Sequence, residues 1–227
     1  MRPLSLLCLA AALPGVYGQA PQVDRSWPPG QNAVKLGVPQ GFLGDHFVLG
    51  ARGEVWIADR LAVWAVVEPN RQADRRLGDL YESVKLLGGI EAELPAPGQP
   101  APPDCACHNL AVLKSAALRT GKDAAETDDV RIFAAAPGVW RIEFQDVRWS
   151  VPGGVPIQFG VLWTERPGTR TQQRSAWFNS AGAGADKHDL RRFDENGRLL
   201  GRYEPESGRL DPAIGFHVQV WGHRSDH

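Results

Sequence analysis

The chain of 227 residues carries 25 lysines and arginines against 26 aspartates and glutamates, which gives a formal net charge of −1. This balance excludes a global positive field of the kind that attracts nucleic acid or anionic lipid, so no nucleic-acid partner is expected. With 25 glycines and 18 prolines, the composition is typical of a fold with many strands and turns and argues against a helical one.

Residues 1–18 show the order of features of a signal peptide. Arg2 is a short positive region, and residues 4–13 are an apolar run that ends at a Pro-Gly break. Val16 and Gly18 are small enough for the −3 and −1 positions of a cleavage site before Gln19. The run is shorter than the roughly 20 apolar residues that span a bilayer, and no later segment is long and apolar enough to do so. A buried N-terminal helix is the alternative. We therefore predict a secreted protein, periplasmic or extracellular, with no membrane span in the mature chain.

The rest of the chain predicts one domain with a preceding arm. Residues 19–42 contain four prolines and no sustained period, which indicates an extended lead-in with an edge strand at residues 33–36. Residues 43–227 are then one domain, since neither side of the Pro-rich segment at residues 91–104 holds enough strands for two. That segment holds five prolines, so it cannot be a central strand and is expected to be a surface loop.

The clearest strand pattern lies at residues 140–163. Apolar and polar residues alternate over residues 140–144, the phase slips by one at 145–146, and the alternation resumes over 147–151, as a β-bulge would allow. The Pro-Gly-Gly turn at 152–154 and the apolar alternation at 157–163 predict a long, bent antiparallel hairpin.

The segment 55–67 predicts a second long strand with two fairly apolar faces. One parity holds the most aliphatic residues and the other holds the two tryptophans: Val55, Ile57, Leu61, Val63, Ala65 and Val67, against Trp56, Ala58, Arg60, Ala62, Trp64 and Val66. Further strands are predicted at residues 80–87, 130–133 and 216–221, and an Asn-Gly hairpin at 190–200, while residues 108–120 fit either a short helix or a strand. The fold prediction is all-β: an antiparallel β-sandwich of jelly-roll type with at most one short helix.

A family resemblance rests on two motifs. Asp45-His46-Phe47 is similar to the Asp-Asp-Phe start of secreted bacterial β-sandwich modules, in which a tryptophan-bearing strand follows about ten residues later, here at Trp56. Their later aromatic strand and Pro-Gly turn resemble V-W-R-I-E-F-Q-D-V-R-W-S-V-P-G-G at residues 139–154. The resemblance, to uncharacterised adhesin-like or carbohydrate-binding-like jelly rolls, spans residues 43 to about 165. It implies a fold and no catalytic residues, and His46 stands where the family has the second acid.

The sequence Cys105-Ala106-Cys107-His108 is the most distinctive chemical motif. In an oxidising compartment two cysteines usually pair, which favours a Cys105–Cys107 disulfide, although so small a ring is strained. Two thiolates and the His108 imidazole could instead hold a zinc or copper ion with a fourth ligand from elsewhere. Free or intermolecular thiols are the third alternative. No other cofactor is expected.

Tryptophans on the less aliphatic strand faces are the candidate ligand contacts. A tryptophan that alternates with Val, Ile and Phe is more often part of a core, but Trp56, Trp64 and Trp221 are opposite the most aliphatic faces and could stack on sugar rings. The side chains that share those faces and could hydrogen-bond sugar hydroxyls are Arg60, His217 and Gln219.

Acidic side chains allow weaker hypotheses. Asp194-Glu195-Asn196-Gly197 is half of a calcium loop and is better explained as a hairpin turn, and the acidic residues between 123 and 129 are more typical of a solvated loop than of a calcium site. Catalytic motifs such as H-E-x-x-H and G-x-S-x-G are missing, although Glu143 with Asp146 or Asp59 could form a carboxylate pair for glycoside hydrolysis.

These observations favour a secreted, non-enzymatic surface or polysaccharide-binding protein, whose partner is a polysaccharide or a cell-surface component. The alternatives are a carboxylate-dependent glycoside hydrolase and a structural subunit that assembles through its sheet edges.

Overall fold

The structure is a computed structural model, and it describes residues 20–26, 33–35, 41–66, 76–90, 109–136, 139–168, 176–178, 190–202 and 215–226. The predicted signal peptide, the Pro-rich loop at 91–104 and the Cys105, Cys107 and His108 motif lie outside these residues, so their assignments stay predictions. Among the described helices, none is long and apolar enough to cross a membrane.

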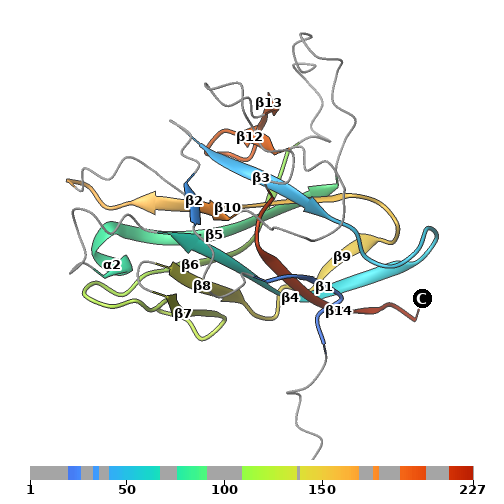
Figure 1. Cartoon of the computed structure of the whole chain (residues 1–227), viewed down its shortest axis with the longest axis horizontal. Helices are drawn as coiled ribbons and strands as arrows, with labels where there is room; N and C mark the ends of the chain where they lie inside the picture. Colours follow the sequence, from blue (N-terminus) through green and yellow to red (C-terminus); the bar gives the residue numbers. More distant parts are fainter. Residues whose placement is uncertain are drawn as a thin grey trace, which may run out of the picture.

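Strands are the main secondary structure of the described residues (Figure 1). In chain order the elements are β1 (Val23–Arg25), β2 (Ala33–Lys35), β3 (Phe42–Phe47), β4 (Val55–Val66), α2 (Leu77–Leu80), β5 (Tyr81–Ile90), β6 (Ala111–Ala117), β7 (Val130–Ala136), β8 (Val139–Phe144), β9 (Trp149–Pro152), β10 (Ile157–Glu165), β11 (Ala176–Phe178), β12 (Arg191–Phe193), β13 (Leu199–Arg202) and β14 (Val218–Arg224). The ambiguous segment at 108–120 is therefore a strand, β6, and β2 falls where the edge strand of the lead-in was predicted.

Two six-stranded sheets contain most of these strands. The first sheet has the order β1-β14-β4-β8-β7, with β9 also paired to β4, and the second has the order β13-β12-β3-β10-β5-β6. Every pair in both sheets is antiparallel. A separate ribbon of β2 and β11 lies against β4. The β12–β13 pair confirms the predicted Asn-Gly hairpin.

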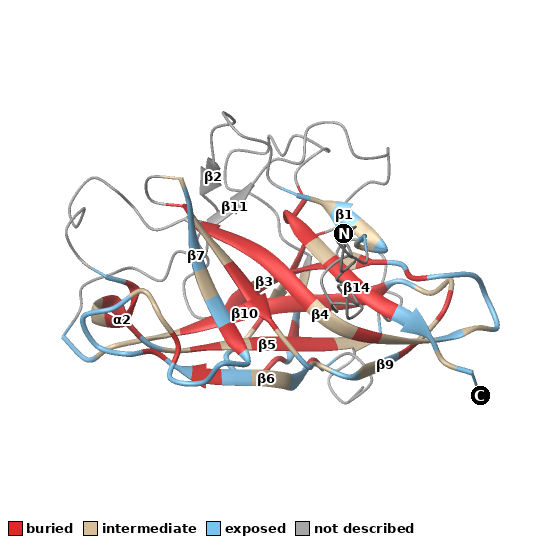
Figure 2. Ribbon diagram, turned by 90° about the horizontal axis from the view of Figure 1, so that it is seen from below, coloured by how far each residue is buried: buried red, intermediate tan, exposed pale blue. Residues whose placement is uncertain are grey.

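The core lies between the two sheets, where alternate residues of both sheets meet. Phe144 and Val220 enter it from the first sheet and Phe159 and Leu86 from the second, all fully buried. Figure 2 shows buried residues concentrated along β4, β14, β10 and β5, and exposed residues along the edge strands β6 and β7. This arrangement confirms the all-β antiparallel sandwich, and within the described ranges α2 is its one short helix.

The predicted hairpin at 140–163 is wrong. β8 and β9 pair with β4 in the first sheet, whereas β10 pairs with β3 and β5 in the second. The turn at 152–154 therefore carries the chain from one sheet to the other. Alternation of apolar residues shows which face of a strand is buried but not which strand lies beside it, so two segments joined by a turn signal need not pair.

The strand β5 continues through two glycines at which the sequence predicted its end. A Cβ atom at Gly88 would lie 2.5 Å from the Trp149 ring and 2.6 Å from Leu113, so a side chain there would collide with both. Trp149 belongs to β9 of the first sheet, and its ring therefore packs across the core onto β5. Gly88 marks a close approach of the two sheets rather than a turn.

Candidate binding face on the first sheet

A bulge divides β4 into two halves. Even-numbered residues face the core before the bulge, and odd-numbered residues face it after the bulge. Trp221 pairs with Arg60 but the next residue, Gly222, pairs with Ala58, so Asp59 is one extra residue in β4. Before the bulge, Ala58 is buried in the core while Val55 is 40% exposed. After it, Leu61 and Val63 face the core.

This bulge separates Trp56 from the other predicted ligand residues. Trp56 shares its face with Ala58, packs against the main core and donates its indole N–H to Glu54 at 2.9 Å. The backbone N–H of Ala51 and then the Trp56 indole hold the pKa of Glu54 below its usual value, with a smaller contribution from Arg224. The single parity predicted for residues 55–67 was wrong because sequence alternation does not reveal a bulge within an almost wholly apolar strand.

The other five predicted ligand residues lie together on the outer face of the first sheet, which we call the aromatic–arginine face. Arg60 and Trp64 come from β4 after the bulge, and Gln219 and Trp221 from β14. His217 stands just before β14 at the same parity, and its ring meets Trp64 edge to face with ring centroids 6.5 Å apart. The opposite parity of the same segments, Phe216, Val218 and Val220, is in the core. Trp64 and Trp221 thus lie on the side of their strands opposite the main core, and their part in ligand binding stays a prediction.

Guanidinium groups cover the tryptophan rings of this face. The Arg60 guanidinium carbon is 3.7 Å from the centroid of the Trp221 ring. Arg141, from β8, is 5.4 Å from the Trp64 ring and 5.9 Å from those of Trp221 and Phe133. Sequence reasoning missed Arg141, although its alternation with core-facing Trp140 and Ile142 places it on this face. Such contacts between a cation and an aromatic ring stabilise both groups in fixed positions.

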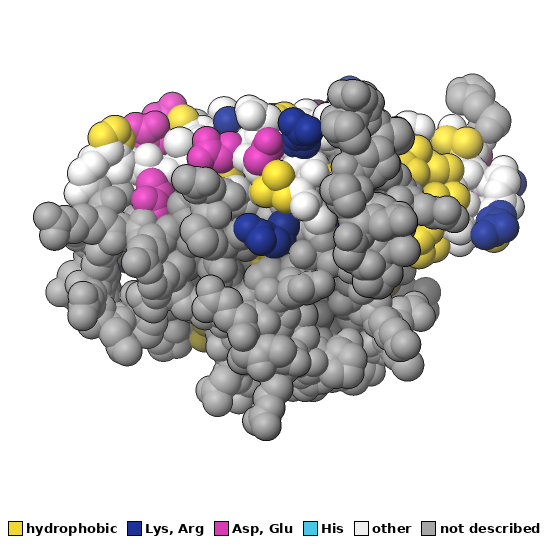
Figure 3. All heavy atoms as spheres, turned by 90° about the horizontal axis from the view of Figure 1, so that it is seen from above, with side chains coloured by type: hydrophobic (Ala, Val, Ile, Leu, Met, Phe, Trp, Pro, Cys, Tyr) yellow, Lys and Arg dark blue, Asp and Glu magenta, His cyan; other side chains and the backbone are white. Residues whose placement is uncertain are grey.

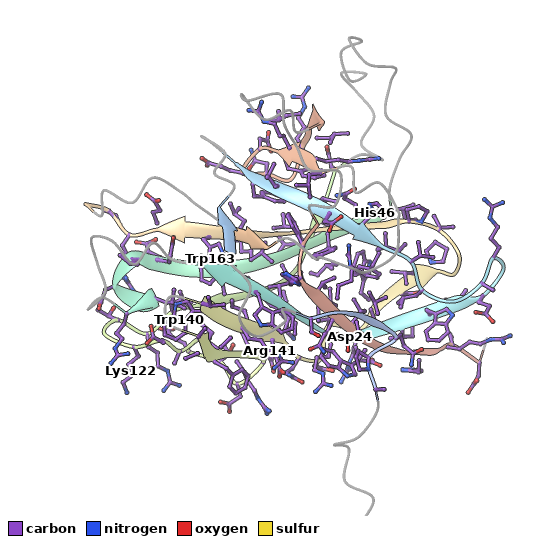
Figure 4. All side chains as sticks on the ribbon, viewed as in Figure 1. Asp24, His46, Lys122, Trp140, Arg141 and Trp163 are labelled. Atoms are coloured by element: carbon purple, nitrogen blue, oxygen red, sulfur yellow. The ribbon has the colours of Figure 1, made fainter. Side chains whose placement is uncertain are left out.

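A chain of polar contacts connects the strands of the aromatic–arginine face. Arg141 forms an ion pair with Glu143 and donates to the Gln219 side-chain oxygen at 3.3 Å. The Gln219 amide donates in turn to Asp24 of β1 at 3.1 Å. Arg141 and Asp24, two members of this relay, are labelled in Figure 4. The relay crosses from β8 to β14 to β1 and so fixes the side chains on the surface of the sheet.

The tryptophan rings themselves are not open platforms. Trp64 is 6% exposed, Trp221 is 9% exposed and His217 is 2% exposed, so these rings offer little surface on which a sugar could stack. His217 Nδ1 is also 3.0 Å from the backbone oxygen of Arg25. What this face offers to a ligand is therefore the half-buried Arg60 side chain and the polar edges around it.

The carboxylates considered for catalysis have other partners. Glu143 is buried, paired with Arg141 and bonded by the Gln145 amide at 2.7 Å. Asp146 pairs with Arg148 at 2.6 Å and Asp59 with the His223 ring at 2.7 Å. Each carboxylate thus has its own partner, and none of the three contacts another in the interactions described.

The acidic loop residues also have structural roles. Asp123 accepts the Leu77 N–H at 2.7 Å and pairs with Arg76, and Asp129 pairs with Lys114 at 3.1 Å. Asp194 accepts two backbone N–H groups of its own turn, as the hairpin interpretation predicted. Within the described residues no group of three or more metal-binding side chains is present. Figure 3 shows acidic and basic side chains side by side on the face seen from above, so the charge there is mixed.

Sequence reasoning did not predict the burial of Asp45, the most deeply buried charge among the described residues. Asp45, on the core side of β3, is fully buried and accepts the N–H groups of His46 and Phe216, each at 2.7 Å. Arg25 of β1 pairs with the same carboxylate at 3.1 Å and also donates to the His46 carbonyl oxygen. The signal was a carboxylate at a core-facing parity in the Asp45-His46-Phe47 motif.

Comparison of this chain with protein-family models, with curated proteins and with solved structures found no match. The conclusions about its function therefore rest on the residues and the geometry described above.

Proposed function

We propose that this chain is a secreted, non-enzymatic protein that binds polysaccharide, or a cell-surface component that carries it, through the aromatic–arginine face. The observation that carries the proposal is the assembly of Arg60, Trp64, Gln219 and Trp221 from two distant segments on one outer sheet face. An extended sheet face with fixed hydrogen-bonding groups suits an extended sugar chain, which offers many hydroxyls.

The relay from Glu143 through Arg141 and Gln219 to Asp24 supports binding rather than chemistry. In this relay the Glu143 carboxylate, which a hydrolase would need for catalysis, is paired with Arg141. The relay also fixes the geometry of the face before a ligand binds. A preorganised surface loses less side-chain entropy on binding.

The test is an array of neutral and charged glycans probed with the mature chain and with the double variant Arg60→Ala/Gln219→Ala. We expect the parent chain to bind at least one glycan class and the double variant to lose most of that signal. The control is Arg52→Ala, which removes an exposed arginine from the turn between β3 and β4. Equal binding by parent and double variant would place the ligand elsewhere.

The same preparation separates the alternatives. Release of reducing ends, abolished by Glu143→Gln, would establish the hydrolase in place of the binding protein. Assembly through sheet edges has its own motive, since the edge strands β6 and β7 expose Val112 at 55% and Phe133 at 44%. A sizing profile that depends on concentration, with no glycan bound, would favour a structural subunit.

A further inference from the structure

We infer that the polysaccharide carries carboxylate groups, as uronate sugars do, and that Arg60 binds such a carboxylate. This inference rests on the proposed function, and it specifies the chemical class of the ligand of the aromatic–arginine face. It follows from how Arg60 differs from the other charged residues on that face.

The flat side of the Arg60 guanidinium packs on the Trp221 ring, and the N–H groups along its edge remain available to a ligand. At 3.7 Å from the ring centroid, its carbon atom is in van der Waals contact with the face of Trp221. Stacking of this kind engages the π faces of both groups, whereas the N–H donors of a guanidinium point outward in its own plane. Among the residues that the structure describes, Arg60 has no hydrogen-bond acceptor and no ion-pair partner.

The neighbouring carboxylates do not neutralise Arg60. Asp59, adjacent in the bulge, binds the His223 ring at 2.7 Å. Glu143 pairs with Arg141, and Asp24 accepts from the Gln219 amide and from the Ser26 N–H. Arg60 is thus a fixed cation on a covered aromatic bed without a counter-ion among these groups. The net charge of −1 for the whole chain means that its attraction for an anion is local.

A planar carboxylate is the ligand group that matches this arrangement. The two parallel N–H bonds of a guanidinium edge fit the two oxygens of a carboxylate, and charge-assisted bonds of this kind are stronger than those to a neutral hydroxyl. The rings beneath are nearly closed to solvent, so sugar stacking contributes less on this face than the half-buried Arg60 cation does. The ligand is therefore selected chiefly by charge.

The experiment compares polygalacturonate with its fully methyl-esterified form, which keeps the sugar chain and removes the charge. We expect the parent chain to bind the acid form about tenfold or more tightly than the ester, a factor typical of losing one charge-assisted bond. Binding should weaken between low salt and about 1 M salt, where the screening length falls to about 3 Å.

Substitutions then assign the effect to Arg60. Arg60→Gln should lose about tenfold in affinity for the acid form and leave the ester unchanged, and Arg60→Lys should recover only part, because an ammonium lacks the planar fork. Arg52→Gln is the control for net charge and should bind as the parent does. Urea unfolding of each variant verifies its fold. If Arg60→Gln does not fold, the affinity of Arg60→Lys for the acid form is compared with that of the parent instead.

Equal affinity for acid and ester, or an equal loss in Arg60→Gln and Arg52→Gln, would overturn the inference and leave the proposed function standing. Binding of dextran sulfate without binding of polygalacturonate would also overturn it. Failure to bind any glycan, neutral or charged, would overturn the proposed function itself.

Discussion

The buried carboxylate of Asp45 and its ion pair with Arg25 hold three separate strands together. Asp45 is fully buried and the Arg25 side chain is only 9% exposed, so their charges are largely removed from water. Because Arg25 belongs to β1 and Phe216 precedes β14, this single carboxylate connects the N-terminal strand, β3 and the last strand. A charge in such a place needs its partner, since burying it alone is very costly.

We predict that Arg25→Leu lowers the free energy of unfolding by about 3–5 kcal/mol, the usual effect of removing one partner of a buried ion pair. The double variant Arg25→Leu/Asp45→Asn should be more stable than Arg25→Leu alone, because the buried negative charge is gone while an acceptor oxygen remains. Urea unfolding of the parent and the variants measures the coupling.

The control for this cycle is the exposed pair Arg148–Asp146, whose side chains are 76% and 54% exposed. Arg148→Leu should cost less than about 1 kcal/mol, as exposed ion pairs do. A double variant in which the losses of Arg25→Leu and Asp45→Asn simply add would show that the two side chains are not coupled.

At the scale of secondary structure, an irregularity shared by neighbouring strands shapes the first sheet. Residues 145–148 separate β8 from β9 and stand opposite only Asp59 and Arg60 of β4. Both halves nevertheless face the core, as the predicted phase slip required, since Phe144 and Val151 are buried. The interruption is longer than the single extra residue predicted. Within it, the Val147 N–H donates to the backbone oxygen of Asp59 at 2.8 Å.

This interruption places Arg148 at a φ of 53°, in the left-handed region that non-glycine residues seldom adopt. Arg148→Gly should therefore leave the free energy of unfolding nearly unchanged or raise it. Ser150→Gly, in the extended strand β9, should lower it by about 0.5–1 kcal/mol, the ordinary cost of glycine in a strand. Denaturant unfolding of both variants compares the two sites, and an equal loss at both would show that the φ of Arg148 carries no strain.

For the molecule as a whole, the packing of the two sheets makes its stability depend on pH at the alkaline end. Tyr81, where α2 meets β5, is buried with its ring centroid 5.0 Å from that of Trp163. Burial, with a smaller effect of the Glu165 charge, raises the pKa of Tyr81 to about 12 from the ordinary value of 10.0. The folded state therefore keeps the phenol neutral over a range in which the unfolded chain ionises it.

The contribution of Tyr81 to stability is fully present below about pH 10 and is lost between about pH 10 and 12. In this window the unfolded state binds fewer protons than the folded state, so the free energy of unfolding falls by up to about 1.4 kcal/mol per pH unit. Tyr81→Phe keeps the ring but has no phenol to ionise, so its free energy of unfolding should fall less steeply with pH. Urea unfolding of parent and variant at pH 8, 10 and 11 would measure this difference. Parallel curves for parent and variant would contradict the assignment.

The sequence by itself determined the fold class, most strand positions and the outward face of Trp64, Gln219 and Trp221. It could do so because the period-2 alternation of apolar residues records which face of each strand is buried. The same property explains why β6 remained ambiguous, since its exposed edge carries little alternation.

Only the tertiary structure decided which strands are neighbours and which side chains meet. Alternation holds no information about partners, so β10 was paired with β9 in the prediction although it lies in the other sheet. Alternation also does not reveal a bulge in an apolar strand, so the core-facing position of Trp56 was missed. Nor does it show which polar side chains from distant segments meet, such as Arg25 with Asp45 and Arg141 with Gln219. The aromatic–arginine face exists because two sheets close over one core and leave those residues on the outside.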